Sequence, residues 1–235
     1  MIVSTLPRGR CRRSVGIRLR RGLQLVACLA AGATLAGCFT GDRPSFEDEQ
    51  PAEPITSTGN PDIDEVLGLL DSVAASEFTA TYAIETRFGA LSSSGVVVQA
   101  PGRRLSVTVE NDERAVRFVI DGAEERTCDL LANECETSLN NARISDTQLG
   151  YDFYAPAIAK RLRADADRQV DDPFAYTKGI GGESASCVDI AVSGGTKTYC
   201  ALDSGAVAEF VGADVTIELL GFSRMADESA FESSR

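Results

Sequence analysis

The residues of this chain best suited to chemistry are its cysteines, since its 235 residues include seven Cys and no His. Without His there is no imidazole base and no His-ligated metal. Cys11 and Cys28 lie in an N-terminal stretch that is first basic and then apolar, and Cys38 follows this stretch. Four more cysteines lie further along the chain: Cys128, Cys135, Cys187 and Cys200.

The N-terminal stretch has the parts of an export signal in the usual order. Its basic part holds seven arginines, and its apolar part runs from Leu23 to Ala36. Leu35-Ala36-Gly37-Cys38 resembles a bacterial lipobox, in which the cysteine is joined to diacylglycerol and becomes the first mature residue. We therefore expect residues 1–37 to be a lipoprotein signal peptide and Cys38 to carry the lipid. An exported product would be anchored to the outer face of the cytoplasmic membrane or elsewhere in the cell envelope.

An ordinary secretory signal and a short transmembrane anchor are the alternatives. A membrane-spanning helix needs about 20 apolar residues, which this run does not supply. An ordinary signal would not require a cysteine at the cleavage point.

The charge of the chain disfavours nucleic acid as a partner. Loss of residues 1–37 lowers the number of basic residues from 23 to 16 against 35 acidic residues, a net charge of −19. Such a chain repels phosphates and anionic headgroups, so membrane attachment would come from the acyl chains on Cys38. The remaining length suits one domain with a substantial core.

The four later cysteines predict two disulfides, because their number is even and the chain is expected to be exported. Three pairings are possible. We favour Cys128–Cys135 and Cys187–Cys200, since each pair flanks a local turn. A zinc site is the weaker alternative, because the chain has neither His nor a Cys-x-x-Cys spacing.

The remaining chain divides into a tether, one domain and a tail. Residues 38–59 are rich in Pro and polar residues and predict a disordered tether. The domain, residues 60–223, opens at Asn60-Pro61-Asp62, which suits a helix N-terminus. Apolar residues then recur at helical spacing: Ile63, Val66, Leu67, Leu70, Val73 and Ala74. The polar tail, residues 224–235, is expected to fray.

Alternating residues predict two antiparallel meanders, since their connections are too short for parallel crossovers. In the first meander, one strand runs from Phe78 to Phe88, a turn follows at Gly89–Gly95, and the next strand covers Val96–Gln99. Further strands lead on to Cys135. A helix over Tyr151–Ala166 separates it from the second meander, whose strands run from Ser184 to Phe222. A two-residue loop at Ser193-Gly194 places Cys187 directly opposite Cys200, within reach of a disulfide.

This order of elements resembles the LolA-like lipoprotein-carrier and LppX/LprG-type lipid-binding families of the bacterial, specifically actinobacterial-type, cell envelope. The similarity rests on Phe78–Tyr82, Gln99–Leu105 and Gly181–Cys187 followed by Tyr199-Cys200. It implies an α+β fold, with a strongly curved antiparallel sheet (an incomplete β-barrel) and helices covering its concave face. It also implies an apolar gap that takes up acyl chains, and no cofactor.

Apolar residues of the predicted strands and helix are the candidates for lining such a gap. Core packing without a gap is the alternative interpretation of the same pattern. The candidates are Tyr82, Ile84, Phe88, Val96, Val98, Leu105, Val107, Val116, Phe118, Ile120, Ile158 and Leu162.

A basic cluster in the predicted helix, at Lys160, Arg161, Arg163 and Arg168, could meet a lipid phosphate or sulfate. We favour a solvated face paired with Asp165 and Asp167. No catalytic residue and no metal site is predicted, because the thiols are used for lipid and disulfides and no carboxylate pair stands out.

Two functions are compatible with these features. The first is a carrier that binds acyl chains or another apolar ligand for lipid or lipoprotein transport. The second is a sensor or regulatory module that contacts an envelope protein and transports nothing, since a fold does not fix a function. A carrier needs a hollow interior and a movable lid, whereas a module can be solid and needs an exposed contact surface.

Overall fold

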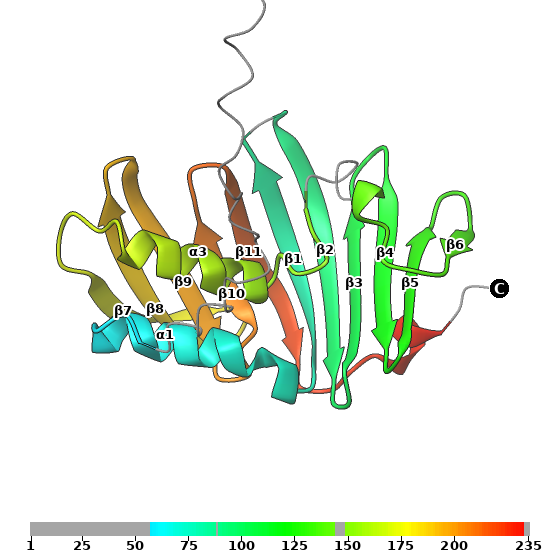
Figure 1. The fold of residues 1–235 in the computed structure, drawn as a ribbon, viewed down its shortest axis with the longest axis horizontal. Coiled ribbons are helices and arrows are strands. Elements are labelled where there is room, and N and C mark those ends of the chain that lie inside the picture. Colours follow the sequence, from blue (N-terminus) through cyan, green and yellow to red (C-terminus); the bar gives the residue numbers. More distant parts are fainter. Residues whose placement is uncertain (1–56, 88, 144–148, 233–235) are drawn as a thin grey trace, which may run out of the picture. The chain divides into compact units, whose positions relative to one another are not determined.

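The computed structural model describes residues 57–87, 89–143 and 149–232. The expected signal peptide, Cys38 and nearly all of the expected tether lie outside these residues, as does Phe88. The described chain forms one large sheet with α-helices and short 3-10 helices (Figure 1). No described helix has the length and apolar character needed to cross a membrane.

The first helix begins where the sequence predicts it. Helix α1 (Pro61–Asp71) continues into the 3-10 helix η1 (Ser72–Ala75). Asn60 caps α1, because its side chain accepts hydrogen bonds from the amides of Asp62 and Ile63 at 3.0 and 3.3 Å. The other helices of the described residues are η2 (Asn141–Arg143), α3 (Pro156–Ala166) and η3 (Glu228–Phe231).

In the described part of the chain, eleven strands form one antiparallel sheet in the order β6-β5-β4-β3-β2-β1-β11-β10-β9-β8-β7. Within the described residues β6 and β7 are the outer strands and no ladder joins them, so the sheet stays open. This agrees with the predicted α+β class. The strands are β1 (Phe78–Thr86), β2 (Leu91–Ala100), β3 (Arg104–Glu110), β4 (Ala115–Asp121), β5 (Glu124–Asp129), β6 (Glu134–Glu136), β7 (Phe174–Ile180), β8 (Glu183–Val192), β9 (Gly195–Leu202), β10 (Val207–Val211) and β11 (Val215–Ser223).

Both disulfides are present with the favoured pairing. Cys128 on β5 is bonded to Cys135 on β6, and Cys187 on β8 is bonded to Cys200 on β9. Val192 pairs with Gly195, and Cys187 pairs directly with Cys200, with 4.1 Å between their Cα atoms. The predicted register of the β8–β9 hairpin is therefore confirmed.

The prediction of a long turn over Gly89–Gly95 is wrong, because β2 already begins at Leu91. Gly95 is a strand residue opposite Tyr82. A Cβ atom at Gly95 would lie 2.8 Å from Ile84 Cδ1 and 3.0 Å from Phe153 Cζ, so any larger residue there would force these side chains to shift. Gly95 therefore marks a close side-chain contact within a strand, and it does not mark a turn.

Strand β7 is not predicted by the sequence pattern. It is an outer strand, and most of its residues are exposed. It therefore lacks the alternation of apolar and polar residues that identifies a half-buried strand.

Helix α3 begins at Pro156, which the sequence places near the helix start, so Tyr151 and Tyr154 of the predicted helical stripe precede the helix. Residues 151–155 form turns, and Pro156 occupies the first helical turn, where its missing N–H is tolerated.

The tail, which the sequence predicts to fray, packs against the sheet over residues 224–232 in this structure. Residues 228–231 form η3, and the side chain of Phe231 is only 5% exposed. It joins a small apolar cluster with Val98, Ala100 and Val119 that is separate from the main core.

Candidate functional site

The structure gathers most of the predicted lining residues in the main core. Strand residues meet residues of α3 there, and each is at most 2% exposed. The residues brought together are Tyr82, Ile84, Val107, Val116, Phe118, Ile158 and Leu162.

Two of the predicted lining residues lie elsewhere. Val96 and Val98 belong to the small cluster around Phe231, while their neighbour Val97 belongs to the main core. Side chains alternate between the faces of a strand, so Val96 and Val98 point to the face opposite the helices. Because the prediction places Leu91–Gly95 in a turn, it does not reveal which face of β2 is internal.

Leu105 and Ile120 pair on the internal face but are only partly buried. Phe88 lies outside the described residues. Most of the predicted lining residues therefore lie in the main core, and Leu105 and Ile120 are only half-buried.

The segment before α3 also packs into this core, and sequence reasoning missed Leu149 and Phe153 within it. Leu149, Phe153 and Tyr154 precede α3 and are 3–7% exposed. The ring of Phe153 meets that of Tyr82 edge-on at 6.0 Å between centroids, and Tyr151 lies 6.4 Å from Phe118. The available signal is the presence of three aromatic residues within Tyr151–Tyr154, a segment that the sequence prediction places in a helical stripe.

Four of the described lining residues are packed with no exposed area. Tyr82, Ile84, Val107 and Leu162 are all 0% exposed. Room for an acyl chain between them would require other core side chains to move.

One polar group inside this core is unsatisfied. The hydroxyl of Tyr82 is buried and has no hydrogen-bond partner among the described residues. Burial raises the pKa of Tyr82 far above its ordinary value, so the phenol stays protonated. By contrast, the Tyr154 hydroxyl donates to Gln99 Oε1 at 3.1 Å.

Helix α3 is tied to the sheet by a buried charged cluster. Asp165 is 5% exposed, and Lys197 Nζ on β9 lies 2.8 Å from both of its carboxylate oxygens. The hydroxyl of Tyr199 also donates to Asp165. Burial first, and then this hydrogen bond, raise the pKa of Tyr199.

A second ion pair ties α3 to the β10–β11 turn. Arg161 donates to both oxygens of Asp214 at 2.7 and 2.8 Å, and its guanidinium lies 5.5 Å from the centre of the Phe210 ring. These hydrogen bonds hold the pKa of Asp214 below its ordinary value.

These contacts correct the expectation for the basic cluster. Arg161 and Arg163 do not pair with Asp165 and Asp167 along the helix, because Arg161 binds Asp214 and Arg163 binds Asp71 of α1. Their role is to join elements that are distant in sequence. Lys160 and Arg168 are exposed.

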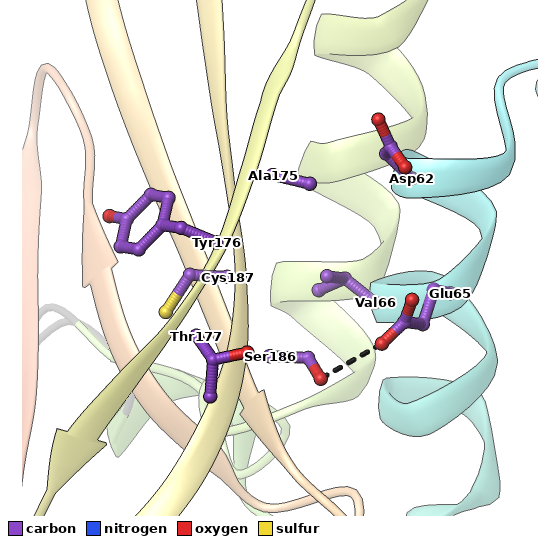
Figure 2. A pocket seen from close by; sticks show the side chains of 8 residues that line it. All are labelled: Asp62, Glu65, Val66, Ala175, Tyr176, Thr177, Ser186 and Cys187. Atoms are coloured by element: carbon purple, nitrogen blue, oxygen red, sulfur yellow. Dashed lines mark hydrogen bonds between the residues drawn. The ribbon is translucent and has the colours of Figure 1, made fainter.

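A small cleft lies between α1 and strands β7 and β8 (Figure 2). Its volume is about 220 Å³, below the range of about 300–1,000 Å³ that small-molecule sites occupy. Asp62 and Glu65 make its α1 side acidic, and Ser186 donates to Glu65 at 2.9 Å. Its polar walls and small size do not suit an acyl chain. In the described part of the chain, no three His, Cys, Asp or Glu residues are grouped closely enough to hold a metal ion.

The chain matches no known protein-family description and no curated protein. Among solved structures it is similar to MucB, with 11% sequence identity, a TM-score of 0.48, and coverage of 74% of this chain and 63% of that one. A complex of Pseudomonas aeruginosa MucA and MucB matches with 10% identity, a TM-score of 0.45, and coverage of 72% and 60%. PNGF-II matches with 14% identity and a TM-score of 0.34, covering 67% of this chain and 30% of that one. The chain thus spans less than two thirds of these proteins.

Proposed function

We propose that the chain is a lipid-anchored protein of the cell envelope that works as a protein-interaction module. In this proposal Cys38 carries the anchor, the polar segment after it is a tether, and the described domain contacts a partner protein. No catalytic step is assigned to it.

The close packing of the described lining residues is the observation that favours a module over a carrier. A carrier must hold an apolar chain between its sheet and its helices, whereas four of the predicted lining residues have no exposed area at all. Two of the ion pairs of α3, with Asp214 and with Lys197, also hold that helix onto the sheet. Opening this interior would break both pairs and expose core side chains.

The two disulfides support export of the chain. Disulfides form and persist in oxidising compartments and are rare in the cytosol. Together with the lipobox-like sequence before Cys38, they favour a location at the cell envelope.

Binding of an apolar ligand is the second candidate function, and one observation favours it. The hydroxyl of Tyr82 is buried in the core without a partner among the described residues, which costs about 1–3 kcal/mol. A ligand with a hydrogen-bonding headgroup would supply that partner if Phe153, whose ring packs against Tyr82, moved away.

Uptake of a fluorescent fatty acid by the full chain separates the two candidates. We expect no saturable binding to the wild-type chain at micromolar concentrations. Phe153→Ala is the matched variant, because it removes a ring from the filled interior and creates space there. We expect this variant to gain binding of the fatty acid. Saturable binding by the wild type would overturn the module and establish the ligand-binding function.

A further inference from the structure

A small apolar surface lies on the face of the sheet opposite the helices. We call it the tail-binding strip and define it by Val96, Val98 and Ala100 of β2, Ser106 of β3 and Val119 of β4. The register places Val98 beside Ser106 and Ser106 beside Val119, so these three residues form a row across the strands. Val98, Ala100 and Val119 are 1–2% exposed and belong to a cluster separate from the main core.

The occupant of this strip is the C-terminal segment of the same chain. After β11 the chain passes β1, where Thr79 Oγ1 donates to the carbonyl of Met225 and accepts from the amide of Asp227, both at 2.9 Å. The segment ends in η3, which contacts β3 and β4 and buries Phe231 in the cluster. Figure 1 shows this red segment beside the lower ends of β4 and β5.

Two arginines of the sheet contact the segment through an ion pair, a cation–π contact and a hydrogen bond. Arg104 Nη2 and Nη1 lie 2.8 and 3.2 Å from the two carboxylate oxygens of Glu228, and the same guanidinium lies 4.2 Å from the centre of the Phe231 ring. Arg126 Nη2 donates to the carbonyl of Phe231 at 2.8 Å. The strip and Arg104 beside it therefore bind a carboxylate and an aromatic ring that are three residues apart in the segment.

The segment leaves one group of the strip unsatisfied. Ser106 is 1% exposed, and its hydroxyl has no hydrogen-bond partner among the described residues. Buried hydroxyls in folded proteins are normally paired, so the present occupant complements the strip incompletely. A different occupant with a hydrogen-bonding group above Ser106 would complete it.

The segment is also an element that can leave without opening the main core. It contains one short 3-10 turn whose polar side chains are exposed, and its apolar contacts lie in the separate cluster. Segments with few buried contacts open at lower free energy than core strands.

We propose that the tail-binding strip is a docking site for an acidic segment of a partner protein, and that the C-terminal segment occupies it in cis. The segment recognised carries a carboxylate three residues before an aromatic residue, together with a group that hydrogen-bonds Ser106. This inference rests on the proposed function, because it names the surface through which the module meets its partner. Because the cis occupant is tethered, a free peptide must compete with it at an effective concentration in the millimolar range.

Binding of a fluorescein-labelled peptide with the sequence of residues 224–232 to the full chain tests the inference by fluorescence anisotropy. We expect weak binding to the wild type, because the cis segment occupies the strip. The double substitution Glu228→Arg and Phe231→Ala releases the cis segment and leaves the strip intact. We expect it to increase the affinity for the peptide at least tenfold.

Two further variants establish where the peptide binds. Adding Arg104→Glu to the released chain should abolish the gain. Adding Arg103→Glu should not, because Arg103 is 65% exposed and pairs with Glu125, away from the segment. Absence of any gain in a released chain that keeps its circular dichroism and melting temperature would overturn the inference. Dimerisation of the released chain without peptide binding would also overturn it, in favour of a second copy as the occupant.

Hydrogen exchange of the wild-type chain provides a second test that needs no substitution. We expect the amides of residues 226–231 to exchange at least tenfold faster than the amides of β3 and β4. Equal protection would mean that the segment is a fixed part of the fold, and would contradict the inference. Neither test uses a fatty acid, so failure of this inference remains distinguishable from failure of the proposed function.

Discussion

At the scale of single residues, Gly95 shows how tightly the interior is packed. A side chain on this strand residue would collide with the ends of Ile84 and Phe153. We expect Gly95→Ala to lower the free energy of unfolding by about 1–3 kcal/mol, because over-packing forces side chains from their preferred rotamers. Urea denaturation measures this change.

Gly179→Ala is the matched control for Gly95→Ala. Gly179 is also a strand residue, but a Cβ atom there would meet nothing within 4 Å. We expect little change in the free energy of unfolding. Equal effects of the two substitutions would show that the interior around Gly95 has spare room.

Asp214 makes the attachment of α3 dependent on pH. Hydrogen bonds from Arg161 lower the pKa of Asp214 in the folded state, so folding favours its ionised form. The resulting stabilisation is present above the ordinary Asp pKa of about 3.9 and is lost as the pH falls through the lower, folded-state pKa. Because the Asp214 side chain is 39% exposed, we expect a contribution below about 1 kcal/mol.

The substitution Asp214→Asn tests this contribution. We expect the variant to unfold at lower urea concentration than the wild type at pH 7, and the difference to shrink below pH 4. A difference that stays constant from pH 7 to pH 3 would contradict an ionic origin.

At the scale of secondary-structure elements, the β8–β9 hairpin is cross-linked at a directly opposed residue pair. The Cys187–Cys200 disulfide joins residues 13 positions apart, and loop closure in the unfolded chain predicts a stabilisation of about 3 kcal/mol. We expect the double substitution of both residues by Ala to lower the free energy of unfolding by about this amount. The disulfide between Cys128 and Cys135 spans only seven positions and reaches the outer strand β6, so its removal should cost less. The reverse order, measured by urea denaturation, would contradict this expectation.

The elements also show what the sequence can and cannot predict. Helix α1 and the β8–β9 register follow from local signals, namely the cap at Asn60 and the loop at Ser193-Gly194. Strand β7 escapes prediction because an exposed outer strand has no buried face to set a pattern.

The candidate site is predictable only in part, for the same physical reason. Alternation identifies two faces of a strand, but it does not show which face is internal when both bury apolar residues. On β2, Val97 faces the main core and Val98 faces the Phe231 cluster, and both are at most 1% exposed. Sequence pattern likewise cannot distinguish a hollow interior from one filled by Phe153 of a distant segment.

At the scale of the whole molecule, the proposed anchor sets where the domain can act. We expect Cys38→Ser to release the chain from the membrane fraction, because the chain without its proposed signal peptide would be strongly acidic and would be repelled by anionic lipid. Metabolic labelling with an alkyne fatty acid should mark the wild-type chain and not the variant. Membrane retention of an unlabelled Cys38→Ser chain would show that another feature attaches it.

The proposed role as an interaction module depends on an interior that is filled by the domain's own side chains. The most direct test is mass spectrometry of the chain purified from its own envelope, under native and then denaturing conditions. A covalent lipid on Cys38 persists after denaturation, whereas a lipid held between the sheet and the helices is lost. We expect the same mass under both conditions. A native mass that exceeds the denatured mass by that of a lipid would contradict the filled interior and establish the domain as a lipid-binding protein.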